Sequence, residues 1–214
     1  MAGSKAYRDL FDRDVPVRLQ RDTVVAIQEA YRDARDYCFD RYPEPVAHDL
    51  WPHERRAMVE TNWQMLASRH TGVIAPFRPN RIGNAFHAQV RVGEMILTTS
   101  FVDAPTKLVR SAEFRNSLAR SSQMTLPTFP EVPPPMREFL YGLIIHGGDE
   151  VDPRVPGFIH VVFPASDCLS YVGRIDLLDR FSDLIAIELS APEQPVQDRA
   201  LPAIKRKRGE MSGT

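Results

Sequence analysis

Near the start of the chain, apolar residues recur every three or four positions, which is the spacing of one face of a helix. Between residues 22 and 42 this face consists of Val24, Ile27, Tyr31, Ala34 and Cys38. Charged residues occupy many of the positions between them, so the pattern predicts an amphipathic helix with its charges in water. Pro43 and Pro45 should end it, because proline has no amide hydrogen for the helical ladder.

A second helical pattern follows. Its apolar stripe consists of Met58, Val59, Trp63 and Leu66. Pro52 suits the first turn of a helix and Gly72 suits a C-terminal stop, so we expect a helix from His53 to Arg69. Each of the two helices has a single apolar stripe. They should therefore pack as a hairpin, on each other or on a sheet.

The pattern then changes to that of β-strands. Two β-rich runs, 84–92 and 95–102, meet at Gly93-Glu94. A type II′ hairpin turn requires glycine at its first central position, so the segment predicts a tight antiparallel hairpin. Asp103 can cap a helix and Pro105 suits a first turn, which predicts a helix over residues 103–122.

In the second half of the chain, short apolar runs indicate buried strands. Runs at 139–145 and 158–163 predict two strands joined by a long loop, and a run at 184–189 predicts a last strand. Residues 166–178 fit either a short helix or a strand.

Strands mixed with helices, without a regular strand–helix alternation, favour an α+β fold: an N-terminal helical hairpin packed with a mainly antiparallel sheet. The chain divides into an N-terminal extension (1–21), the two hairpins with a helix (22–125), a Pro-rich crossing (126–136), the second part of the sheet (137–191), and a mobile basic tail (192–214). No apolar run approaches the ~20 residues that span a bilayer, so we expect a cytoplasmic protein without a membrane partner.

Composition narrows the function classes. The 27 Lys and Arg residues balance 28 Asp and Glu residues, which argues against a protein built chiefly to coat nucleic acid. Cys38 and Cys168 are the only cysteines and form no disulfide framework, so both are expected to be free thiols. Glycine-rich phosphate loops and nucleophile-elbow motifs are absent from the sequence.

The stretch with the most candidate metal ligands lies between two predicted strands. Imidazole and carboxylate side chains suit a divalent transition metal that activates water. The candidate ligands are His146, Asp149, Asp152 and His160. Their spacing matches no established ligand signature, so a metal-assisted hydrolase is the alternative hypothesis and a solvent-exposed acidic turn is the main one.

Polar residues on and before the predicted β-hairpin form a candidate ligand face. They are Arg81, Asn84, His87 and Arg91. The two-residue period of a strand would place His87 and Arg91 on one side. The same pattern also describes the solvent-facing side of a half-buried antiparallel pair.

A third hypothesis is nucleic-acid binding. It would use Lys107, Arg110 and Arg120 on the predicted helix, with Lys205, Arg206, Lys207 and Arg208 in the tail. At 100° per residue the helical cations scatter around the axis, whereas a helix that follows phosphates presents them together.

Apolar residues at a helix boundary and in Pro-rich connections favour protein binding instead. They are Trp51, Phe77, Phe129 and Met136. We therefore expect a non-catalytic regulatory or accessory component without a cofactor, which binds another protein or a second copy of itself.

Overall fold

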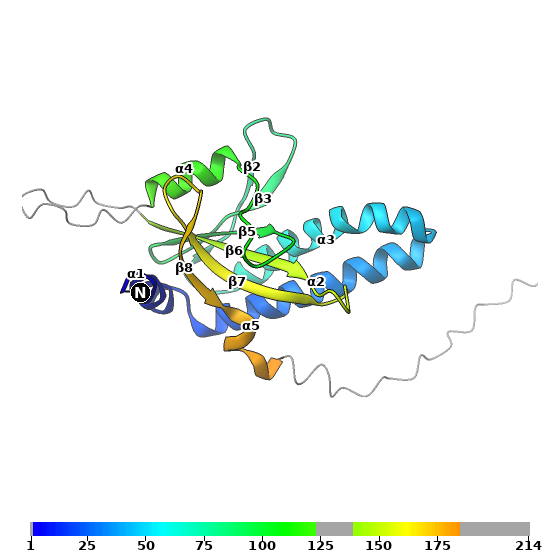
Figure 1. The fold of residues 1–214 in the computed structure, drawn as a ribbon, viewed down its shortest axis with the longest axis horizontal. Coiled ribbons are helices and arrows are strands. Elements are labelled where there is room, and N and C mark those ends of the chain that lie inside the picture. The colour runs from blue at the N-terminus through cyan, green and yellow to red at the C-terminus, as the bar shows by residue number, and fades with distance from the viewer. Residues whose placement is uncertain (1, 123–138, 185–214) are drawn as a thin grey trace, which may run out of the picture.

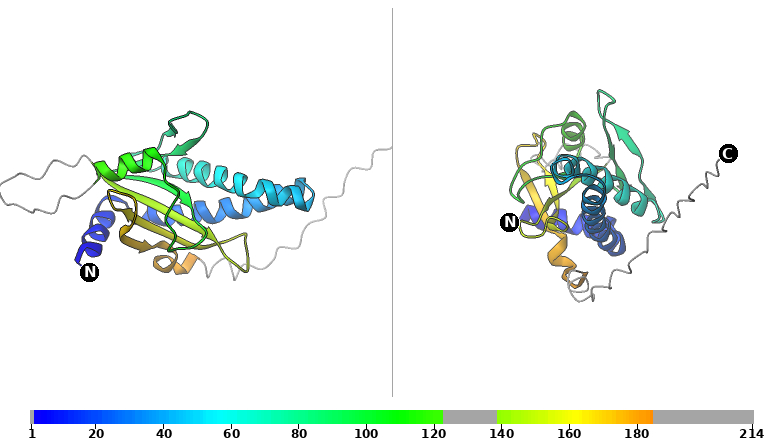
Figure 2. Two further views of the ribbon diagram at one scale, coloured as in Figure 1. Left: turned by 45° about the horizontal axis from the view of Figure 1, so that its top comes forward. Right: turned by 90° about the vertical axis from the view of Figure 1, so that its right-hand side faces the viewer.

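The computed structural model describes residues 2–122 and 139–184. Three helices begin the chain: α1 (Ala2–Asp14), α2 (Val17–Arg41) and α3 (Glu44–Ala67). α2 and α3 pack along each other as a hairpin whose far end extends beyond the sheet (Figures 1 and 2). The predicted helical hairpin is confirmed, and the predicted apolar face of α2 is buried.

The predicted start of the second helix was wrong. α3 begins at Glu44, so Pro52 lies inside it rather than at its first turn. Pro45 occupies the first turn, where a missing amide hydrogen costs nothing. Pro52 removes one internal hydrogen bond, but the burial of Val59 and Trp63, about two and three turns later, holds the helix through tertiary packing.

Eight strands and two short helices follow in the described part of the chain after α3. They are β1 (Val73–Ile74), β2 (Phe77–Pro79), β3 (Phe86–Ala88), β4 (Val90–Val92), β5 (Met95–Phe101), α4 (Glu113–Ser121), β6 (Leu140–Gly148), β7 (Pro156–Pro164), β8 (Tyr171–Asp176) and α5 (Leu177–Arg180). Six strands form one sheet in the order β1-β4-β5-β6-β7-β8, and β2 and β3 form a separate ribbon. Every neighbouring pair is antiparallel except β5 and β6, which confirms the α+β fold with a mainly antiparallel sheet.

The sheet has a hydrophobic core on each face. Leu140 and Ile144 of β6 belong to the core under α1, α2 and α3, whereas Tyr141 and Leu143 belong to the core on the α4 side. The same alternation runs along β7. Because both faces of these strands are covered, their sequences appear as continuous apolar runs rather than alternating ones.

The tight hairpin is confirmed between β4 and β5. Val92 pairs with Met95, so Gly93-Glu94 forms the two-residue turn. Gly93 has a φ of +55°, the left-handed conformation that this turn needs at its first position. The first strand is shorter than predicted, however, because the chain leaves the sheet before β4 and β3 pairs with β2 instead.

The predicted helix over 103–122 was largely wrong. Residues 103–112 are not helical, and α4 covers only Glu113–Ser121. A single turn closes where the Lys107 amide donates to the Ala104 carbonyl at 3.0 Å, beside an ion pair between Lys107 and Asp103. Beyond it, the Val109 amide donates to the Tyr171 hydroxyl at 3.2 Å. The contact with Tyr171 of β8 holds the segment against the sheet instead of in a helix.

In the second half, β6 and β7 form the predicted pair, with a connection shortened to residues 149–155. Strand β8 followed by α5 resolves the open choice at 166–178 mainly in favour of a strand. The predicted crossing at 126–136, the tail at 192–214 and all but the first residue of the predicted strand at 184–189 lie outside the described residues. Cys38 and Cys168 are both free thiols.

Among the helices that the structure describes, none combines the length and apolar character that crossing a membrane requires.

Candidate functional site

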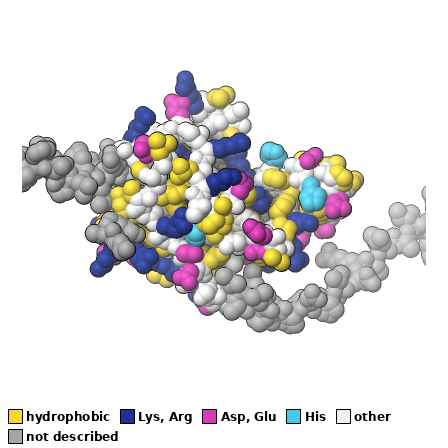
Figure 3. Space-filling model, viewed as in Figure 1, with side chains coloured by type: hydrophobic (Ala, Val, Ile, Leu, Met, Phe, Trp, Pro, Cys, Tyr) yellow, Lys and Arg dark blue, Asp and Glu magenta, His cyan; other side chains and the backbone are white. Residues whose placement is uncertain are grey.

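A cleft of about 1230 Å³ opens beside the end of β5. One wall is the stretch of α3 from residue 56 to 60, and the opposite wall is the segment 102–115 that leads into α4. The turn between β2 and β3 closes one end, and His146 of β6 lies at the inner surface. On the face drawn in Figure 3, basic side chains lie among hydrophobic ones rather than in a separate block.

The cleft exists because β3 separates from β5. The ladder between β4 and β5 ends at Val90 and Leu97, and continued pairing would place Ala88 opposite Thr99. Instead, the Ala88 amide donates to Glu60 Oε2 at 2.6 Å, and the Thr99 side chain hydrogen-bonds to the same carboxylate. The Glu60 carboxylate thus takes the place of one backbone pairing between β3 and β5. Burial raises the pKa of this carboxyl, and the two hydrogen bonds oppose the increase.

Large hydrophobic side chains lie exposed in the cleft. Ile82 is 81% exposed and Phe86 is 57% exposed, and Phe101 and Leu108 are also exposed on its walls. Single exposed apolar residues are common, but several gathered in one concave place make this cleft the candidate site.

The cleft also has an excess of positive charge. Arg81 pairs with Glu113 at 3.1 Å, and Lys107 pairs with Asp103. Three more arginines line the cleft and form no ion pair with any described residue: Arg56, Arg110 and Arg115. Against them stands Glu60, which is already hydrogen-bonded within the fold. An acidic group is therefore the complement of this surface.

Two aromatic contacts fix the wall formed by α4. The His87 ring stacks on Phe114 with centroids 3.7 Å apart, and Arg115 lies 5.0 Å from the Phe114 centroid. Burial, then the charges of Arg115 and Arg56, lowers the pKa of His87. The imidazole is therefore neutral at neutral pH and adds no charge to the cleft.

His146 occupies the inner end of the cleft. Its Nδ1 lies 2.8 Å from the Tyr31 hydroxyl of α2, and the residue is 2% exposed. Burial, with a smaller effect from the nearby charge of Arg55, lowers the pKa of His146 to about 3. The buried histidine is therefore a neutral hydrogen-bonding group.

The alternative metal site is not assembled. His146 pairs with Ile159 while His160 pairs with Ile145, so the two imidazoles project from opposite faces of the sheet. His160 instead bonds to Asp176 of β8 at 3.2 Å. In the part of the chain that the structure describes, no three His, Cys, Asp or Glu side chains come together as metal ligands would.

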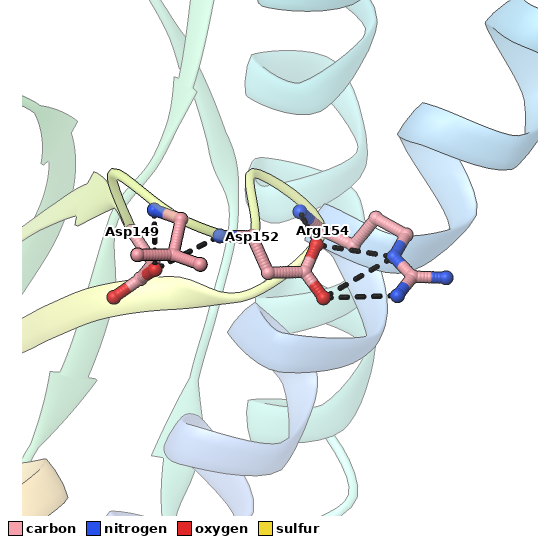
Figure 4. Close-up of polar contacts among 4 residues, drawn as sticks. Asp149, Asp152 and Arg154 are labelled. Atoms are coloured by element: carbon pink, nitrogen blue, oxygen red, sulfur yellow. Dashed lines mark hydrogen bonds and ion pairs between the residues drawn. The ribbon is translucent and has the colours of Figure 1, made fainter.

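The acidic stretch that suggested the metal is turn material. Asp149 Oδ1 accepts hydrogen bonds from the amides of Val151 and Asp152, at 2.8 and 2.9 Å. Asp152 in turn pairs with Arg154 at 3.0 Å (Figure 4). These carboxylates are thus used locally to hold the connection between β6 and β7.

The structure separates the predicted ligand face. Arg81 and His87 line the cleft, whereas Asn84 accepts a hydrogen bond from Asn80 at 2.7 Å within the turn between β2 and β3. Arg91 is exposed on β4 and does not line the cleft. His87 and Arg91 were predicted to share one side of a single strand, but they lie on β3 and β4, which belong to different sheets.

The residues predicted to bind nucleic acid or a protein partner also lie in separate places. Lys107 and Arg110 line the cleft from a non-helical segment, and Arg120 lies on α4 outside it. Phe77 is exposed on β2, and Trp51 is half-buried inside α3 rather than at a helix boundary. The predicted residues outside the described ranges are Phe129, Met136, Lys205, Arg206, Lys207 and Arg208.

Sequence reasoning missed several residues of the cleft, above all Glu60 and Arg115. One signal was present for Glu60: it falls between Val59 and Trp63 on the apolar stripe of its helix, where a charged residue needs a partner. The partner is a backbone amide 28 residues later in the chain, which no local pattern reveals.

Comparison with known proteins found no match: no family model fits the chain, and no curated protein and no solved structure matches it.

Proposed function

We propose that this chain is a non-catalytic binding protein whose cleft receives a segment of another protein. One observation carries the proposal: four exposed large hydrophobic side chains and three arginines without ion pairs among the described residues line the same cleft. Apolar side chains of a partner would be removed from water against Ile82, Phe86 and Leu108, which supplies the main driving force of association.

The charges indicate the kind of segment. Arg56, Arg110 and Arg115 would attract Asp or Glu side chains and repel Lys and Arg, so a partner segment should mix apolar and acidic residues. This chemistry also fits a second copy of the chain if that copy presents such a segment.

The hydrogen bonding of the cleft supports binding rather than nucleophilic catalysis. In residues 2–122 and 139–184, no histidine hydrogen-bonds to a serine, threonine or cysteine. Glu60, the buried acid of the cleft, is used to terminate the strand pairing.

A displayed library of random peptides, selected against the full chain, tests the proposal. Selected peptides should combine apolar and acidic residues and carry few basic ones. Arg110→Glu should weaken their binding by about tenfold, or about 1.4 kcal/mol. Arg120→Glu is the matched control, because Arg120 is an exposed arginine on α4 outside the cleft, and it should bind as the parent chain does.

Peptides whose affinity is the same for the parent chain and for Arg110→Glu would refute binding in the cleft. A labelled oligonucleotide that binds the parent chain and is lost with Arg110→Glu would assign the cleft to nucleic acid and would also refute the proposal. Light scattering completes the test: an increase in mass with concentration that Arg110→Glu abolishes would identify the partner as a second copy.

A further inference from the structure

The most unusual charged residue lies behind the cleft, in α3. The Arg55 side chain is enclosed, with the residue only 7% exposed. Its guanidinium carbon lies 4.1 Å from the ring centroid of Phe101 and 4.9 Å from those of Tyr31 and Trp51. It forms no hydrogen bond and no ion pair with any residue in the described ranges. A buried arginine normally has a carboxylate or several carbonyl partners.

Two further side-chain donors lie beside Arg55, and each is closed off from solvent. Arg35 Nη1 and Trp51 Nε1 are buried and find no hydrogen-bond partner among the described residues. The Arg35 guanidinium lies 5.6 Å from the Trp51 ring centroid, so this indole has one arginine from α2 and one from α3 as neighbours. Three hydrogen-bond donors and two positive charges thus gather around a single ring.

Contacts with aromatic rings do not fully compensate this arrangement. A ring attracts the guanidinium charge, but it does not replace the hydrogen bonds that the N–H groups lose on leaving water. Asp103 and Asp152 act on Arg55 and Arg35 through their charges, but neither forms an ion pair with them: Asp103 pairs with Lys107, and Asp152 pairs with Arg154. The cluster therefore retains both positive charge and donor capacity.

We infer that Arg35, Trp51 and Arg55 form a binding site for an oxyanion, either a carboxylate or a phosphate group, between α2 and α3. The planar guanidinium groups match the paired oxygens of both anions, and the indole N–H adds a third donor. An anion here reduces the repulsion between the two arginines and satisfies donors that are otherwise unmet. None of these three residues lines the cleft, although Arg55 contacts the ring of Phe101, which does.

Trp51 reports directly on the site, since the chain contains only one other tryptophan, Trp63. In a Trp63→Phe variant of the full chain, titration with inorganic phosphate and with acetate, at constant ionic strength, should change the Trp51 emission to a plateau. A plateau with acetate indicates a carboxylate ligand, and a plateau with phosphate alone indicates a phosphate-bearing one. Arg55→Met should abolish both, whereas Arg41→Met, at an exposed arginine that ends α2 and does not line the cleft, should leave them unchanged.

The melting temperature of the chain with both tryptophans gives a second measurement, which remains useful if Trp63→Phe does not fold. The anion that binds should raise the melting temperature of the parent chain and not that of Arg55→Met. Without added anion, Arg55→Met should be as stable as the parent or more so, because it removes a buried charge that has no ion pair among the described residues. The inference would be overturned if neither anion changed the Trp51 emission or the melting temperature of the parent chain. An equal response from Arg55→Met would also overturn it.

Discussion

The buried pair of Tyr31 and His146 makes the stability of this fold depend on pH in a way that one substitution can isolate. His146 is neutral in the folded state because burial lowers its pKa to about 3 from an ordinary value of 6.5. In the unfolded chain the same imidazole is in water and takes a proton near its ordinary pKa. As the pH falls below 6.5, the unfolded state therefore gains a proton that the folded state does not accept.

The sign follows from this difference in bound protons. Where the unfolded state binds more protons, stability rises with pH, so the fold loses stability as the pH falls from 6.5 toward 3. Between pH 7 and about pH 4, these two pKa values correspond to a loss of about 3 kcal/mol from this one residue. His146→Gln keeps a polar side chain that can hydrogen-bond to Tyr31 but removes the titration, so the variant should not suffer this part of the loss.

Urea denaturation followed by circular dichroism, at several pH values between 4 and 7, measures the effect. The free energy of unfolding of the parent chain should fall about 3 kcal/mol further over this range than that of His146→Gln. His53→Gln removes an exposed histidine from α3 and should follow the parent curve. Parallel curves for the parent chain and His146→Gln would refute the claim that the folded protein keeps this imidazole neutral.

Three further substitutions test other contacts by denaturation. Tyr31→Phe removes the hydroxyl partner of the buried histidine and should cost about 1–3 kcal/mol at neutral pH, and an unchanged midpoint would contradict the hydrogen bond. Gly147→Ala would place a Cβ 2.4 Å from the Phe158 ring and should cost about 1–3 kcal/mol, whereas Gly148→Ala, with no atom closer than 3.7 Å, should cost less; equal losses would argue against this packing. Burial raises the pKa of the Glu60 carboxyl, so the parent chain loses stability relative to Glu60→Gln as the pH rises through that pKa. The difference should be about 1.4 kcal/mol for each unit by which the pKa is raised. A difference that shrinks with rising pH would contradict the burial effect.

Local periodicity was enough to predict the helical hairpin, the buried strands and the tight turn. The spacing of Val24, Ile27 and Tyr31 places them on one side of any helix that forms, so their shared burial follows from helical geometry. Gly93 was equally informative, because a two-residue turn needs a residue that adopts a positive φ without steric cost.

Predictions failed where a short-range signal competed with packing. Asp103 and Pro105 resemble the start of a helix, yet only one turn forms before Val109 is held against Tyr171 of β8. Pro52 resembles a first-turn residue, yet α3 begins eight residues earlier, at Glu44. In both places a tertiary contact outweighed a local preference of about 1–3 kcal/mol.

The candidate site was predicted only in fragments. Arg81, His87, Lys107 and Arg110 were singled out, but in separate hypotheses about separate ligands, and the structure brings them to one cleft. The residues of the proposed oxyanion site were not recognised as a group, because α2 and α3 have to pack before Arg35 and Arg55 share a neighbour.

The order of apolar and polar residues along the chain specifies which segments become helices and strands. A helix depends on neighbours three or four positions away, and a strand on neighbours two positions away. The cleft and its surroundings arise from distant pairs: Glu60 with Ala88, Tyr31 with His146, and β5 with β6. Such pairs form only when the whole core assembles, because their burial and hydrogen bonds must together exceed the entropy lost by closing long loops. For that reason most of the secondary structure could be read from the chain, and the cleft could be found only in the folded molecule.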